Sequence, residues 1–97
     1  MAGYLIANID VKDPAKFEEY RQQVAPPIKK FGGRYLIRGG DVRCLEGNPQ
    51  RKRFVVVEFP TVEAAQQFYD SAEYQPILKL RLDSTLSDLV LVQGYSG

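Results

Sequence analysis

Arg38 and Glu58 are the two residues of this sequence whose types best suit binding chemistry. Each lies in a run that alternates like a β-strand, and the two strands are hairpin neighbours, so we expect the side chains to face each other. Asn8, on the first strand, is expected to join them. Such a group would bind an anionic or carbonyl-bearing ligand through Arg38, with Glu58 as the base. A structural ion pair at a dimer interface explains the same pattern, because a carboxylate in an apolar strand needs a partner.

Tyr74 and Arg81 form a second candidate group, because their spacing would place them on one face of a helix. In the functional interpretation they form a lid over a pocket. In the alternative, Tyr74 packs under a loop and Arg81 makes a surface ion pair with Asp83 or Asp88. No catalytic residue is named, and the candidate ligand-binding residues are Asn8, Arg38, Glu58, Tyr74 and Arg81.

The 97 residues include no histidine and one cysteine, Cys44. Without histidine the chain lacks the side chain best suited to proton transfer near neutral pH and the usual ligand of haem and of many zinc sites. We predict no metal and no cofactor. A lone cysteine forms no internal disulfide, which fits a reducing compartment, so the expected location is the cytoplasm.

The residue pattern predicts six elements in the order strand, helix, strand, strand, helix, strand. Asp13 and Thr61 are good N-caps for the two helices, and Pro26-Pro27 is expected to kink or break the first helix. Gly39-Gly40 is expected to bend the second strand. The expected ranges are strand 4–11, helix 13–32, strand 35–44, hairpin loop 46–52, strand 53–59, a helix from Thr61, a segment 72–82 divided at Pro76, and strand 89–95.

This order predicts a single α+β domain over residues 1–97, with the ferredoxin-like βαββαβ pattern. The sheet is expected to have four antiparallel strands with the helices on one face. A short accessory helix follows the second main helix.

Five short motifs follow one another along the chain, and their order and spacing are informative: Gly33-Arg34-Tyr35-Leu36-Ile37-Arg38-Gly39-Gly40, Val57-Glu58-Phe59-Pro60, Ser71-Ala72-Glu73-Tyr74-Gln75, Arg81 and Gly94-Tyr95. Together they make the chain resemble a family of small bacterial proteins, domain of unknown function 1330, of the dimeric α-β barrel superfamily. Ala72, where the family often has proline, and Pro26-Pro27 depart from its pattern. The resemblance implies an architecture and no activity. The superfamily includes cofactor-free monooxygenases, lactone isomerases and haem enzymes, and the fold does not choose among them.

The expected strands are apolar on both faces, as in the first strand, where Leu5, Ala7 and Ile9 oppose Tyr4 and Ile6. The helices can cover only one face, and a strand that faces water should alternate apolar with polar residues. We therefore predict a homodimer that joins the sheets face to face and buries on the order of 2,000 Å² in total.

The formal net charge of +1 gives no reason to expect nucleic acid as a partner, and no apolar run approaches a membrane span of about 20 residues. Two functions stay open. The protein binds a small organic molecule between sheet and helices, with cofactor-independent chemistry there, or it is a non-catalytic dimeric module with a stress-related or regulatory role. A pocket of roughly 300 Å³ or more with convergent polar groups would favour the first.

Overall fold

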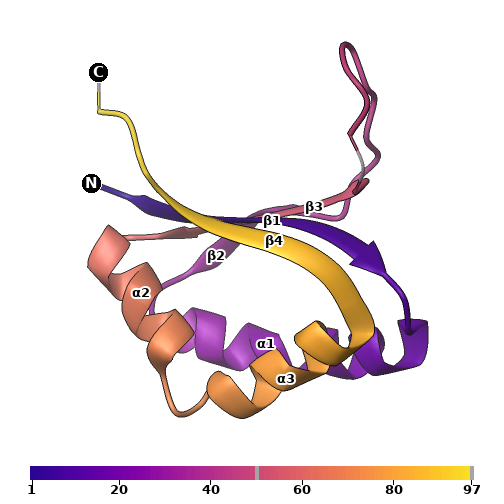
Figure 1. Ribbon diagram of the computed structural model, residues 1–97. Helices are drawn as coiled ribbons and strands as arrows, with labels where there is room; N and C mark the ends of the chain where they lie inside the picture. Colours follow the sequence, from indigo (N-terminus) through magenta and orange to yellow (C-terminus); the bar gives the residue numbers. More distant parts are fainter. Residues whose placement is uncertain (50, 97) are drawn as a thin grey trace.

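The protein folds as a single sheet with its helices on one side (Figure 1). The computed structural model describes residues 1–49 and 51–96, which form four strands in the antiparallel order β2-β3-β1-β4 and three helices. The ferredoxin-like α+β prediction is confirmed. The elements are β1 (Gly3–Val11), α1 (Pro14–Lys30), β2 (Arg34–Arg38), β3 (Arg53–Phe59), α2 (Val62–Asp70), α3 (Gln75–Ser84) and β4 (Thr85–Gln93).

Strand alternation divides the sheet into an inner face toward the helices and an outer face away from them. On β1, Leu5, Ala7 and Ile9 are buried, whereas the residues between them are only half-buried. Phe59 on β3 and Phe68 on α2 lie in the same core, with ring centroids 5.4 Å apart. The inner face therefore carries the hydrophobic core.

Helix α1 runs without interruption through Pro26 and Pro27, so of the expected kink or break the break is wrong. Asp13 caps its start as predicted, because the side chain accepts a hydrogen bond from the Lys16 amide at 3.2 Å. Each internal proline removes a backbone donor. The loss falls close to the helix end, where Pro27 itself is buried with Val24 and Ile28. Burial of this last stretch offsets the missing hydrogen bonds.

Strand β2 ends at Arg38 rather than continuing to residue 44 as expected. Its pairing with β3 is irregular: Tyr35 lies opposite Val57, and Ile37 lies opposite the next residue, Val56. Leu36 is thus an extra residue, which makes a β-bulge. Residues 39–49 and 51–52, here called the arm, project away from the helices (Figure 1). The arm contains the expected hairpin loop, of which Gln50 lies outside the described residues.

The two remaining helices begin and end close to the predicted positions. Thr61 caps α2 by accepting a hydrogen bond from the Ala64 amide at 3.0 Å. The segment after α2 is divided as expected, into a turn and then α3, with Pro76 in its first turn. Strand β4 begins at Thr85, four residues earlier than predicted at 89, because Ser84 already ends α3.

Gly33 is where the end of α1 meets the core. A β-carbon at Gly33 would lie 2.7 Å from Phe59 Cε1 and 2.8 Å from Ile28 Cγ2, whereas a β-carbon at Gly40 would meet nothing within 4 Å. We predict that Gly33→Ala lowers the free energy of unfolding by roughly 1–3 kcal/mol through overpacking. The matched control Gly40→Ala should change it by less than about 0.5 kcal/mol. Urea unfolding measures both, and equal effects would contradict the packing at Gly33.

Candidate functional site

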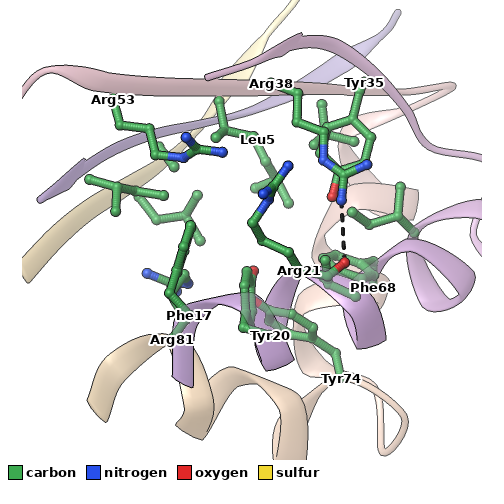
Figure 2. A pocket seen from close by; sticks show the side chains of 17 residues that line it. Leu5, Phe17, Tyr20, Arg21, Tyr35, Arg38, Arg53, Phe68, Tyr74 and Arg81 are labelled. Atoms are coloured by element: carbon green, nitrogen blue, oxygen red, sulfur yellow. Dashed lines mark hydrogen bonds between the residues drawn. The ribbon is translucent and has the colours of Figure 1, made fainter. Parts of the chain in front are cut away.

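A cavity of about 50 Å³ lies between the inner face of the sheet and the helices (Figure 2). Its walls are mainly apolar, with Leu5, Val57 and Phe68 among the lining residues. An engineered cavity of roughly 150 Å³ in another protein takes up benzene. At about 50 Å³, the cavity is smaller than that one and than the roughly 300 Å³ expected of a ligand-binding pocket. Any organic ligand has to displace lining side chains.

Three arginines from different elements meet at one side of this cavity and are called the arginine cluster: Arg21, Arg38 and Arg53 (Figure 2). The guanidinium of Arg38 lies over the Tyr35 ring at 4.3 Å and donates a hydrogen bond to the Arg21 carbonyl at 3.2 Å. The guanidinium of Arg53 lies over the Phe17 ring at 5.3 Å. Aromatic faces thus hold two of the three cations and leave N–H edges available.

No carboxylate is among the described residues that line the cavity. Glu18 pairs with Arg21 at 3.1 Å on the protein surface. The Nε atoms of Arg21 and Arg53 are buried and have no hydrogen-bond partner in the described part of the chain. Burial, followed by the charges of Arg21 and Arg38, lowers the pKa of Arg53. The cluster is a partly desolvated group of like charges with unused donors, which favours an anion.

The inner end of the cavity is formed by Tyr20, Tyr74 and Arg81, which are called the inner group. The hydroxyls of Tyr20 and Tyr74 lie 2.9 Å apart, and Tyr74 and Arg81 are 1% and 4% exposed. Arg81 donates a hydrogen bond from Nη1 to Ser87 Oγ at 2.6 Å. Burial, followed by the neighbouring Tyr74, raises the pKa of Tyr20 well above its usual value, so Tyr20 stays a neutral phenol.

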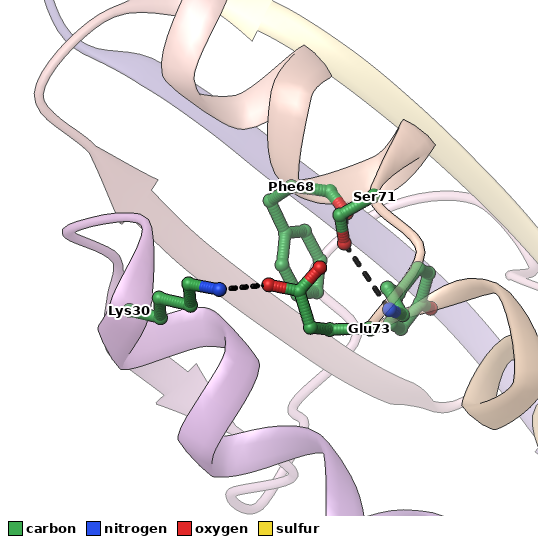
Figure 3. Close-up of polar contacts among 5 residues, drawn as sticks. Lys30, Phe68, Ser71 and Glu73 are labelled. Atoms are coloured by element: carbon green, nitrogen blue, oxygen red, sulfur yellow. Dashed lines mark hydrogen bonds and ion pairs between the residues drawn. The ribbon is translucent and has the colours of Figure 1, made fainter.

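Tyr74 is positioned by the turn between α2 and α3 (Figure 3). Ser71 Oγ accepts a hydrogen bond from the Tyr74 amide at 3.1 Å and donates one to the Phe68 carbonyl at 2.8 Å. The adjacent Glu73 forms an ion pair with Lys30 at the end of α1. The turn is therefore tied to α1, and the Tyr74 ring packs 4.4 Å from that of Phe68.

The structure separates the predicted site residues into two groups. Arg38, Tyr74 and Arg81 line the cavity on the inner side. Their role in binding a ligand stays a prediction. The alternative for Arg81, a surface ion pair with an aspartate, is wrong, because Arg81 is buried and Asp88 pairs with Arg51.

Glu58 does not face Arg38, which corrects the first expectation. Glu58 lies opposite Arg34, which donates a hydrogen bond to it at 2.7 Å, and Tyr4 donates another at 3.0 Å. Regular alternation along β2 would place Arg34 and Arg38 on one face, but the extra residue Leu36 turns Arg38 to the inner side.

Asn8 also lies apart from the cavity. It shares a row of the sheet with Phe54 on β3 and Asp88 on β4, on the same outer face as Glu58. Its Oδ1 atom is buried and has no hydrogen-bond partner among the described residues.

Arg21 and Arg53 are site residues that the sequence interpretation missed. Arg21 occupies a position of the apolar stripe that contains Phe17, Val24 and Ile28, and an arginine at such a position is a usable signal. Arg53 lies on the same face of β3 as the inward residues Val55 and Val57, although the basic run at 51–53 suggested a solvated loop. Both signals are arginines at positions where the pattern calls for an apolar residue.

The described residues contain no group of three or more histidine, cysteine, aspartate or glutamate side chains that could hold a metal ion. None of the described helices is long and apolar enough to cross a membrane.

The sequence matches a known protein family over almost its whole length. Residues 2–95 match the family described as "Domain of unknown function (DUF1330)". The chain belongs to the DUF1330 family. No curated protein matches it.

Solved structures with the same fold cover almost the whole chain. A protein of unknown function from Rhodopseudomonas palustris has a TM-score of 0.79 at 14% identity, covering 99% of this chain and 84% of that one. SnoaB from Streptomyces nogalater, described as a cofactor-independent oxygenase, has a TM-score of 0.62 at 15% identity. The match covers 99% of this chain and 95% of SnoaB. A dimeric ferredoxin-like protein of unknown function from Jannaschia sp. CCS1 has a TM-score of 0.66 at 10% identity. The match covers 97% of this chain and 100% of that one. At these identities the likeness concerns the fold.

The hydrogen bonds to Glu58 give a pH-dependent contribution to stability. Those from Arg34 and then Tyr4 hold the pKa of the Glu58 carboxyl below its usual value. This stability is present above the unfolded-state pKa of about 4.3 and is lost as the pH falls through the folded-state pKa. We predict that Glu58→Gln is less stable than wild type at neutral pH and that the difference shrinks in acid. Urea unfolding across pH measures it against exposed Glu19→Gln, and a pH-independent difference would contradict it.

Proposed function

We propose that this DUF1330 protein binds a small organic anion with an apolar body in the cavity between the sheet and the helices. The observation that carries the proposal is the arginine cluster, which faces a cavity with no carboxylate among its described lining residues. A carboxylate of the ligand would add to the counter-charge that Glu18 gives Arg21, and it would accept hydrogen bonds from the unused N–H groups of Arg21 and Arg53. The apolar walls would hold the rest of the molecule.

Entry of such a ligand requires the cavity to widen, and the side chains of the arginine cluster can move to allow it. The backbone of α1 lies against α3 and stands off from the sheet, so side chains span the intervening layer (Figure 1). Arg21 is half-buried and Arg38 is exposed, so these long side chains have room to adopt other rotamers. Their rotation toward a bound anion opens space beside Tyr35 without moving the sheet.

The proposal extends to cofactor-independent chemistry on the bound molecule. Two features support it: the likeness in fold to SnoaB, described as a cofactor-independent oxygenase, and the neutral phenol of Tyr20 as a hydrogen-bond donor inside the cavity. We also infer a location in the bacterial cytoplasm. The exposed thiol of Cys44 supports this, since thiols stay reduced there.

A second candidate function is a non-catalytic dimeric module with a stress-related or regulatory role. The observation that favours it is the close packing of aromatic rings around the small cavity, where Phe68 and Tyr69 lie 4.4 and 5.8 Å from Tyr74. A module of this kind would need no exchangeable ligand. Ligand titration separates the two candidates.

We further propose that two copies pair through the outer face. Sheet register aligns four apolar residues in one row across the strands: Ile37, Val56, Ile6 and Val90. No described helix covers this row, and Ile37 and Val90 are 46% and 51% exposed (Figure 1). The arm projects on the same side, and a similar fold from Jannaschia is described as dimeric. A second copy offering the same row would bury it.

For ligand binding we predict that hexanoate or benzoate stabilises the protein, approaching about 2.7 kcal/mol at a hundredfold excess over the dissociation constant. Arg38→Gln should weaken binding by about tenfold or more, because a charge-assisted hydrogen bond is lost. Arg43→Gln, on the exposed arm, is the matched control and should bind like wild type. Thermal unfolding and calorimetric titration measure both. Absence of binding by either acid would favour the structural module.

For assembly we predict that wild-type protein sediments at twice the monomer mass at low micromolar concentration. Val90→Lys places a charge in the apolar row and should give a folded monomer, because burying an unpaired ammonium is costly. Leu82→Lys on α3 is the control, since Leu82 is similarly exposed, at 57% against 51% for Val90, but lies on the helix side. Sedimentation equilibrium decides it, and a monomeric wild type would refute the pairing.

A further inference from the structure

The inner group has more hydrogen-bond donors than the cavity has acceptors. The hydroxyls of Tyr20 and Tyr74 form one hydrogen bond with each other at 2.9 Å. Two phenols carry two hydrogens, and only one hydrogen can lie between the two oxygens. The other has no acceptor among the hydrogen bonds of the described residues, whichever phenol carries it. One phenolic O–H is therefore left for a molecule in the cavity.

Arg81 adds a positive charge to the same place. Its guanidinium donates a hydrogen bond to Ser87 Oγ, a neutral oxygen, and Arg81 is 4% exposed. A buried guanidinium without a carboxylate keeps unused charge and N–H groups. The inner group thus presents a donor beside a cation, which suits an oxygen atom that carries full or partial negative charge.

The inner group and the arginine cluster line one cavity (Figure 2). All polar side chains among its described lining residues are arginines or tyrosines, so both ends offer donors, and the walls between them are apolar. A ligand that satisfies both ends needs acceptors at both ends and an apolar middle. A simple fatty or aromatic acid satisfies only the arginine cluster.

We propose that the ligand is an apolar acid with a second acceptor oxygen, a ketone or enolate oxygen, that binds between the Tyr20–Tyr74 pair and Arg81. This inference rests on the proposed function, because it places the ligand's carboxylate at the arginine cluster. It adds the chemical class of the far end. An oxo acid offers an acceptor to the phenolic O–H and to Arg81, whereas the matching alkanoate offers none there, which disfavours it.

The test compares straight-chain oxo acids with alkanoates of the same chain length, from 4-oxopentanoate and pentanoate to 7-oxooctanoate and octanoate. Calorimetric titration of the full-length protein should give at least one oxo acid that binds about tenfold more tightly than its alkanoate. Tyr20→Phe and Tyr74→Phe singly should each keep part of the preference, since the remaining phenol can still donate. The double variant should lose most of the preference, because Arg81 alone remains to contact the second oxygen.

Tyr69→Phe is the matched control: its ring lies 5.8 Å from that of Tyr74, but it does not line this cavity, so the preference should remain. The wild-type comparison needs no variant, so it decides the inference even if the double variant unfolds. Alkanoate binding without preference for any oxo acid overturns this inference and leaves the proposed function intact. An undiminished preference in a folded double variant also overturns it. Absence of binding by all acids overturns both.

Discussion

The layer between sheet and helices has to hold guanidinium groups without carboxylates, and much of the local structure serves that requirement. Arg38 and Arg53 lie on the faces of aromatic rings, which partly replace a counter-ion. Gly39, at φ +73, ends β2, and a β-carbon there would lie 2.5 Å from Arg53 Cζ. Backbone geometry at the end of β2 therefore depends on where the arginine of β3 must lie. Burial of apolar side chains in the core beneath the cluster offsets the free-energy cost of holding these like charges together.

The sheet separates two kinds of surface that alternate residue by residue along each strand. On β3, Val55 lines the cavity while Val56 belongs to the outer apolar row. A ligand site and an assembly surface can thus occupy one thin sheet, because each strand contributes to both. Glu58 fits this division, since its partners Tyr4 and Arg34 bind it at the edge of the outer row. Small domains gain from this arrangement, because their own core is limited.

Much of the fold followed from the sequence because periodicity and caps are local signals. The alternation of β1, the Asp13 and Thr61 caps and the division at Pro76 were all predictable from a few neighbouring residues. The site was only half predictable. Arg38 was identified as a candidate site residue, but the prediction that it faces Glu58 was wrong. A bulge depends on pairing between strands and leaves no clear local pattern. Arg53 was missed because it closes a basic run typical of loops.

The bulge at Leu36 has a consequence for how relatives of this protein are compared. Regular pairing of Leu36, without a bulge, would turn Arg38 out of the cavity and place Ile37 inside, exchanging a cation for a hydrocarbon without changing either residue. Two homologues with the same arginine, one bulged and one regular, would use it for different purposes. A shared arginine in this strand is therefore evidence of a shared environment only when the pairing between β2 and β3 agrees too. The gain or loss of a bulge gives this fold a short evolutionary path between different side chains on the inner face.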